Sequence, residues 1–206
     1  MWALIEDNTI TKIINNPKAM LIGDTQYSRN IFSFRWSNEE REAIGLYEIV
    51  FNNTNKKDEA YYINTNQSFA FADGVVTASF GSATAKAHAD TTWSQDDEDA
   101  GDLPSDKSVG DVRTRGLKYN LIQTIKKQAA GILQDTDWYI VRKADASTAV
   151  PSAITTHRAA VRTKAAAQET QITNASDTPA LETLYTYTIT DGVQSRPLGE
   201  LPRLES

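Results

Sequence analysis

The residue types best suited to chemistry lie between residues 132 and 162. Two carboxylates, Asp135 and Asp137, flank the end of an expected helix in the sequence QDTDW. Paired carboxylates support acid–base catalysis when burial or neighbouring charge pushes their pKa values apart. Aspartate and threonine beside a helix end more often satisfy backbone groups locally. We therefore interpret Asp135, Thr136 and Asp137 as residues that end or cap a helix.

No other pattern of reactive groups accompanies this pair. His157 is expected within a helix, and the nucleophile pattern G-x-S-x-G is absent. The chain also lacks a phosphate loop, a Rossmann glycine run and the H-E-x-x-H motif. It has no cysteine and only two histidines, which argues against disulfides, thiolate sites and a histidine-based metal site. The sequence predicts no catalytic, cofactor-binding or metal-ligating residue, and a protein that is not an enzyme.

The net charge of −6 is concentrated in residues 94–111, which carry seven acidic residues and one base, Lys107. We expect residues 89–111 to be an acidic linker or long loop, since they offer little apolar surface to bury. A calcium loop at Asp97, Asp99 and Gly101 is the alternative, but the spacing departs from the EF-hand pattern. A chain without a basic footprint is not expected to bind nucleic acid.

Residues 1–88 are expected to form a β-rich N-terminal domain with one short helix. Residues 1–15 alternate as strand, turn and strand. Ser37 and Glu40 have the spacing of a capping box, which predicts a helix over 38–44. Gly45 suits the left-handed position after that helix, before a strand at 46–51.

A second hairpin is predicted within residues 60–81, where Asp73 and Gly74 form a favoured turn dipeptide. Phe69 and Phe71 then share one side of a strand. We interpret them as core residues, and an exposed aromatic face for carbohydrate or protein contact is the alternative.

Residues 112–190 are expected to form a helical domain, which makes the fold class α+β. Leucine and isoleucine recur every three to four residues over 112–134. Pro151 suits the first turn of a helix that ends near Ala175, and its alanine-rich stripe predicts close packing against a neighbour or a second copy. A third helix is predicted with Thr178 as its cap. Residues 191–206 are expected to be an extended tail, either disordered or held by a partner.

The connection between the first two of these helices is predicted to be an extended crossing. Trp138 is expected to bury its ring between the helices. Arg158 and Arg162 lie one helical turn apart, and an ion pair with Asp135 or Asp137 is their first expected role.

The apolar runs are far shorter than the roughly 20 residues that span a bilayer, so no membrane span is expected. The start MWALIED has neither the basic nor the apolar region of a secretory signal.

Two stretches resemble phage tail and tail-fibre-assembly proteins. LQDTDWYIVRKADAS followed by VPSAITTHRAAVR is similar to a pattern that reads roughly L…TDW…P…YR…LR, with His157 where tyrosine is more common. The stretch from Asn16 to Val50, which includes IFSFRWSNEEREAIGLYEIV, is similar to an opening found in proteins of marine and cyanobacterial phages. The structural or interface candidates on these stretches are Trp36, Ser37, Glu40, Gly45, Asp137, Trp138, Pro151, Arg158 and Arg162.

The resemblance implies a non-enzymatic structural protein of a phage virion, associated with the tail, tail fibres or baseplate. The alternative is a tail or tail-fibre assembly chaperone that acts in the host cytoplasm and is absent from the virion. Either role implies other phage structural proteins as partners, and the repetition of tail parts implies a homo-oligomer. An enzyme that acts on the host surface is the third and least favoured class.

Overall fold

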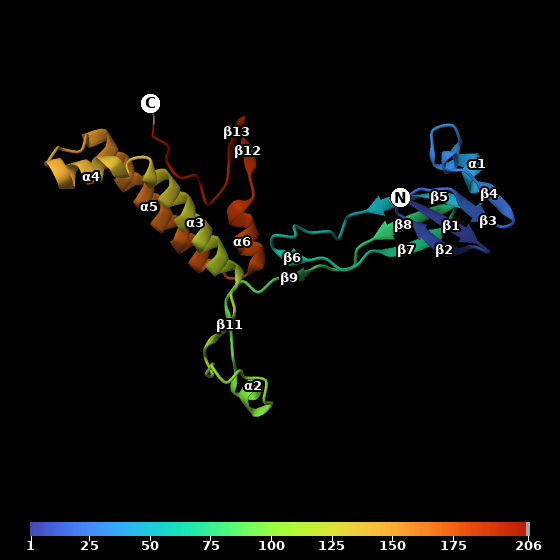
Figure 1. The fold of residues 1–206 in the computed structure, drawn as a ribbon, viewed down its shortest axis with the longest axis horizontal. Coiled ribbons are helices and arrows are strands. Elements are labelled where there is room, and N and C mark those ends of the chain that lie inside the picture. The colour runs from blue at the N-terminus through green and yellow to red at the C-terminus, as the bar shows by residue number, and fades with distance from the viewer. Residues whose placement is uncertain (205–206) are drawn as a thin grey trace. The chain divides into compact units, whose positions relative to one another are not determined.

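The computed structural model, which describes residues 1–204, divides the chain into two compact units, residues 1–84 and 85–206 (Figure 1). The first unit is β-rich with one short α-helix, and the second holds the long helices, so the predicted α+β class is confirmed. The predicted division differs from this one. The acidic segment, the long helices and the tail group into a single unit, and the first unit ends at residue 84, four residues before the predicted end of the first domain at residue 88.

A five-stranded sheet organises the first unit, in the order β2-β1-β5-β8-β7. Its strands are β1 (Trp2–Glu6), β2 (Thr9–Ile14), β5 (Leu46–Asn52), β7 (Ser68–Ala72) and β8 (Val75–Ser79). Only β5 and β8 run parallel; the other neighbours are antiparallel. Asp7–Asn8 and Asp73–Gly74 make the two predicted hairpin turns, and all four residues have positive φ, which such tight turns require.

Alternation along β1 divides the core of this unit between the two faces of the sheet. Ala3 and Ile5 join the cluster formed with β5 and β8, and Trp2 joins a second cluster around Ile31 and Leu46. Phe69 and Phe71 are partly buried against the first cluster, which confirms their interpretation as packing residues. The second face is covered by short elements: β3 (Met20–Ile22), β4 (Thr25–Tyr27) and the 3-10 helix η1 (Arg29–Phe32) all contribute side chains to it.

Helix α1 (Asn38–Glu42) begins with the predicted capping box, in which the side chains of Ser37 and Glu40 each accept the other's backbone N–H. Gly45 follows with φ of +77°, and the Ile5 N–H donates to its carbonyl at 2.7 Å. A Cβ at Gly45 would collide with the Ile5 carbonyl oxygen, so both the backbone angle and the space require glycine here. The short strand β6 (Tyr62–Ile63) precedes β7, and β9 (Thr84–Ala85) lies where the units divide.

The predicted linker 89–111 has more structure than a loop. β10 (Thr91–Thr92) pairs with β11 (Val112–Thr114), and α2 (Gln95–Asp99) lies between them; we call residues 89–115 the acidic excursion. Arg113 holds it together, because its guanidinium bonds the Asp97 carboxylate at 2.8 Å and lies over the Trp93 ring. Charge pairing and a cation–π contact therefore replace the apolar core that this segment lacks.

Helices α3 (Leu117–Gln134) and α5 (Ser152–Asn174) form the antiparallel pair at the centre of the second unit (Figure 1). Their direction follows from cross-links near both ends: Lys118 donates to the Thr173 carbonyl, and Arg158 donates to the Leu133 carbonyl. The buried positions of α5 recur alternately every four and three residues, as in a coiled coil. They are Ile154, Arg158, Val161, Ala165, Gln168 and Ile172, with His157 beside them.

This pairing changes the interpretation of the alanine-rich stripe. The stripe packs closely against a neighbour, as predicted, and that neighbour is α3 of the same chain. It is therefore not free to contact a second copy.

The prediction of an extended crossing between the two long helices was wrong. Residues Asp137–Ala146 form helix α4, which ends at Ser147 in the left-handed conformation. None of its residues is buried, and Trp138 is 51% exposed rather than inserted between the helices. Its ring instead stacks on Tyr139, with centroids 3.8 Å apart, and carries the Arg142 guanidinium.

Helix α6 (Thr178–Tyr185) begins one residue before the position predicted from its proline. Asp177 is the cap, since its carboxylate accepts the Ala180 N–H at 2.8 Å. Thr178, the predicted cap, is buried and its hydroxyl donates to the Lys86 carbonyl.

The predicted tail 191–206 begins as a hairpin strand, β13 (Val193–Ser195), paired with β12 (Thr188–Thr190). Residues 196–200 then cross the helices, and Leu198 is completely buried. The Leu198 N–H donates to the Leu184 carbonyl, and Gln168 donates to the carbonyls of Leu198 and Gly199. The tail is therefore held by its own chain up to this point, and residues 205–206 lie outside the described residues. Across the described part of the chain, no helix combines the length and hydropathy that crossing a bilayer requires.

Candidate interaction site

The segment with the richest chemistry in the sequence is a structural clamp. Arg158 is buried, and its guanidinium donates to the Leu133 carbonyl at 2.7 Å and the Thr136 hydroxyl at 2.6 Å. The same group pairs with Asp137 at 2.8 Å, so the predicted ion pair is confirmed for Arg158. One arginine thus joins the end of α3, the start of α4 and the N-terminal part of α5.

The other predicted residues of this segment do not gather around the clamp. Asp135 and Arg162 are exposed, and within residues 1–204 neither takes part in an ion pair. Pro151 occupies the N-cap position of α5. His157 is buried on α5. The arrangement gives no pair of carboxylates around a shared space.

The candidates of the first unit have structural roles. Trp36 packs edge-on against Tyr27 with centroids 5.9 Å apart, and it lies against the second core cluster. Ser37 and Glu40 are used by the capping box, and Gly45 by the turn into β5.

Hydrogen bonds lower the pKa of two carboxyls in the acidic excursion. Ser94 lowers the pKa of Asp97 most, with further effect from Arg113. The Gly116 N–H lowers the pKa of Asp90, and Arg115 adds to it. Both carboxylates are thus committed to holding the backbone of the excursion. No group of three or more metal-ligating side chains occurs among residues 1–204, the calcium alternative at Asp97 and Asp99 included.

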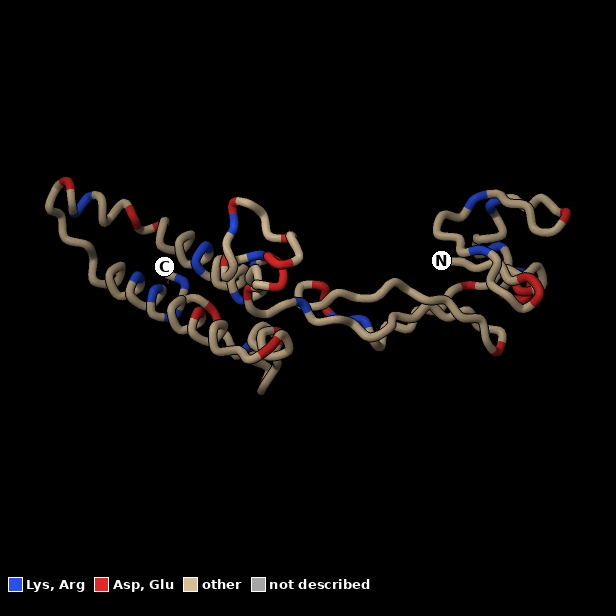
Figure 2. Tube along the Cα trace, turned by 90° about the horizontal axis from the view of Figure 1, so that it is seen from below, with Lys and Arg blue, Asp and Glu red and all other residues tan. Residues whose placement is uncertain are grey.

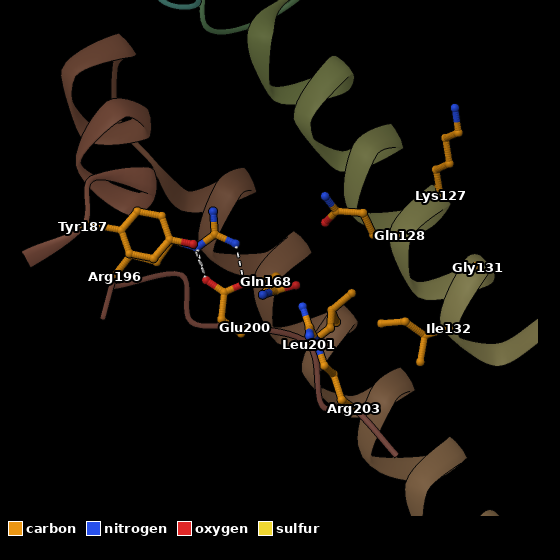
Figure 3. A pocket seen from close by; sticks show the side chains of 10 residues that line it. All are labelled: Lys127, Gln128, Gly131, Ile132, Gln168, Tyr187, Arg196, Glu200, Leu201 and Arg203. Atoms are coloured by element: carbon orange, nitrogen blue, oxygen red, sulfur yellow. Dashed lines mark hydrogen bonds and ion pairs between the residues drawn. The ribbon is translucent and has the colours of Figure 1, made fainter. Parts of the chain in front are cut away.

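A groove of about 700 Å³ lies on the helix pair beside the tail (Figure 3). We call it the tail groove; the residues that line it are Lys127, Gln128, Gly131, Ile132, Gln168, Tyr187, Arg196, Glu200, Leu201 and Arg203. They come from α3, α5, the residues flanking the β12–β13 hairpin, and the tail, so segments far apart in the sequence build this one feature.

Glu200 organises one wall of the tail groove. It accepts the Tyr187 hydroxyl at 2.6 Å and pairs with the Arg196 guanidinium at 2.8 Å (Figure 3). The hydrogen bond to Glu200 raises the pKa of Tyr187, because the phenol donates best while it keeps its proton. Burial likewise raises the pKa of the neighbouring Tyr185. This wall is therefore preorganised and close to neutral.

The floor of the tail groove is formed by Gln168, which is 1% exposed. Its amide nitrogen donates to the Gly199 carbonyl at 2.9 Å, and its amide oxygen has no hydrogen-bond partner. Sequence inspection missed Gln168 and the groove. A polar residue at a coiled-coil position was the only available signal, and the rest depends on how the tail folds back.

Comparison with known proteins gives no neighbour: no protein-family model, no curated protein and no solved structure matches the chain.

Proposed function

We propose that this chain is a non-enzymatic structural protein of a phage virion, associated with the tail, the tail fibres or the baseplate. Its partners are other phage structural proteins and further copies of itself, and nucleic acid is not among them. It is part of the virion, and during assembly it is in the host cytoplasm. The two stretches of resemblance support the lineage.

The observation that carries the proposal is the apolar surface that the second unit leaves exposed. A protein that functions within a larger assembly is expected to have such surface.

Exposed apolar side chains lie on two short elements of this unit, helix α4 and the β12–β13 hairpin. Trp138, Ile140 and Val141 are exposed on α4, and Ile189 and Val193 are 75% and 66% exposed on the β12–β13 hairpin. A short helix without buried residues and a hairpin of two strands are both marginal when isolated in water. Both are suited to become stable where a neighbouring protein covers them.

Quantitative mass spectrometry of purified particles tests the proposal. Particles from infected host cells are washed at high salt, and the chain is measured against the capsid protein of the same phage. A constant ratio through successive washes is the expected result. Absence from particles, together with a soluble complex with a tail or fibre protein in the lysate, overturns it in favour of the assembly chaperone.

A further inference from the structure

The amide of Gln168 indicates what the tail groove lacks. Its nitrogen donates to the carbonyls of Leu198 and Gly199. Rotating the amide by half a turn would place its own oxygen next to these two carbonyl oxygens, and oxygen atoms without hydrogen repel one another. The oxygen is therefore held as an acceptor, and it is unpaired although the side chain is almost fully buried. A buried acceptor without a donor destabilises the folded state, and an occupant with an N–H or O–H group would relieve it.

The charges of the tail groove define the occupant further. Arg196 is neutralised by Glu200, whereas Lys127 and Arg203 form no ion pair within residues 1–204. Ile132 and Leu201 add apolar surface between them. The groove therefore suits a polypeptide segment with carboxylates, a small apolar group and a hydrogen-bond donor.

The acidic excursion offers such a segment at residues 102–106, with the sequence DLPSD. Asp102 has no side-chain hydrogen bond or ion pair within residues 1–204, and Asp106 has only its exposed neighbour Lys107, at 3.6 Å. Pro104 and Ser105 between them are exposed, and they supply an apolar ring and a hydroxyl donor. In Figure 2 the acidic residues of this segment are coloured red.

The excursion of the same chain is tied away from the groove. Asp90 binds Arg115 and the Gly116 N–H at the N-terminal end of α3, whereas Lys127 and Ile132 lie towards its other end. At about 1.5 Å per residue these positions are roughly 15 to 24 Å farther along the helix. A second copy does not have this restriction.

Building on the self-association proposed above, we propose that the tail groove binds residues 102–106 of a second copy. The carboxylates of Asp102 and Asp106 pair with Lys127 and Arg203, and the segment donates a hydrogen bond to the Gln168 oxygen. Each copy then offers a groove to one neighbour and a segment to another. Such a head-to-tail contact closes into a ring or continues as a filament.

Charge reversal followed by sedimentation velocity of the full chain tests the proposal. Reversing the groove, Lys127→Glu with Arg203→Glu, should weaken self-association about tenfold or more, because attraction becomes repulsion. Reversing the segment, Asp102→Lys with Asp106→Lys, should do the same. Combining all four changes should restore association to within about threefold of the original, since the pairs are re-formed with opposite sign.

The control is Lys143→Glu, which reverses an exposed charge on α4 outside the groove and should leave association unchanged. Circular dichroism of every variant checks that the helices remain folded. A strictly monomeric chain overturns the proposal. So does a segment reversal without effect while the groove reversal disrupts, because the groove then binds another occupant. Neither result alters whether the chain is found in particles, so the proposed function is tested separately.

Discussion

Replacing Arg158 should destabilise the helical unit more than any other single change at the clamp. In Arg158→Ala, the Thr136 hydroxyl and the Leu133 carbonyl both lose a charged donor. Each lost buried hydrogen bond costs about 1–3 kcal/mol, and the lower end applies because Thr136 still bonds the Leu133 carbonyl. Loss of the buried side-chain stem adds about 1 kcal/mol. We expect a decrease of about 3 kcal/mol in the free energy of unfolding.

Removing the other partner of the ion pair should have a smaller effect. The side chain of Asp137 is 55% exposed and that of Arg158 only 8%, so water screens the pair from the aspartate side. Asp137→Asn is therefore expected to cost about 0.5–1 kcal/mol. Arg162→Ala is the matched control, because this arginine is exposed one turn later, and its effect should stay within about 0.5 kcal/mol.

Urea unfolding followed by far-ultraviolet circular dichroism measures these differences, since the helices of the second unit dominate that signal. The midpoint of the helical transition is compared among variants, because two units need not unfold in one step. If Arg158→Ala and Arg162→Ala gave equal losses, the clamp would not stabilise the helix pair and the reasoning would be refuted.

Three further changes test features of the two units. Gly45→Ala should destabilise the first unit by about 2 kcal/mol or more in thermal unfolding, because the added Cβ meets the Ile5 carbonyl oxygen. Gly74→Ala is the control, since Gly74 has a positive φ but open space around it, and it should cost about 1 kcal/mol. Equal effects would show that the contact with Ile5 adds nothing. Asp177→Ala removes the cap of α6 and should cost about 1 kcal/mol in the same assay, and no change would rule out that cap. Hydrogen bonds from Ser94 lower the pKa of Asp97, so its stabilisation of the excursion is complete above pH 3.8 and is lost as the pH falls below it. The protection of the excursion's amides from hydrogen exchange, corrected for the intrinsic pH dependence of exchange, should fall over that acidic range. Asp97→Asn should weaken this pH dependence, and Asp90, whose pKa is also lowered, should account for the remainder.

The features predicted correctly from the sequence are those that depend on local chemistry. The Ser37–Glu40 capping box and the Asp73–Gly74 turn each satisfy or shape a few neighbouring residues, so their spacing alone specifies them. The periodicity of α3 and α5 is similarly visible, because both helices bury one side.

The failures have two origins. Trp138 was expected to bury its ring between the helices, but residues 137–146 form a helix, and Tyr139 and Arg142 of that helix contact the ring instead. The groove floor was missed because Gln168 interrupts an apolar pattern, and its partners lie thirty residues away in the tail. No spacing rule relates those positions.

Residues 196–200 are synthesised after all the helices that they cover. Until Leu198 and Gly199 are available, the Leu184 carbonyl lacks the N–H that donates to it, and the Gln168 amide lacks the carbonyls that accept its hydrogen bonds. The space that Leu198 occupies in the core is then unfilled. A nascent or proteolytically shortened chain that stops at Ser195 would contain every helix and still have an incomplete core. Only chains translated past this point form the tail groove, so truncated copies would lack the contact proposed for it.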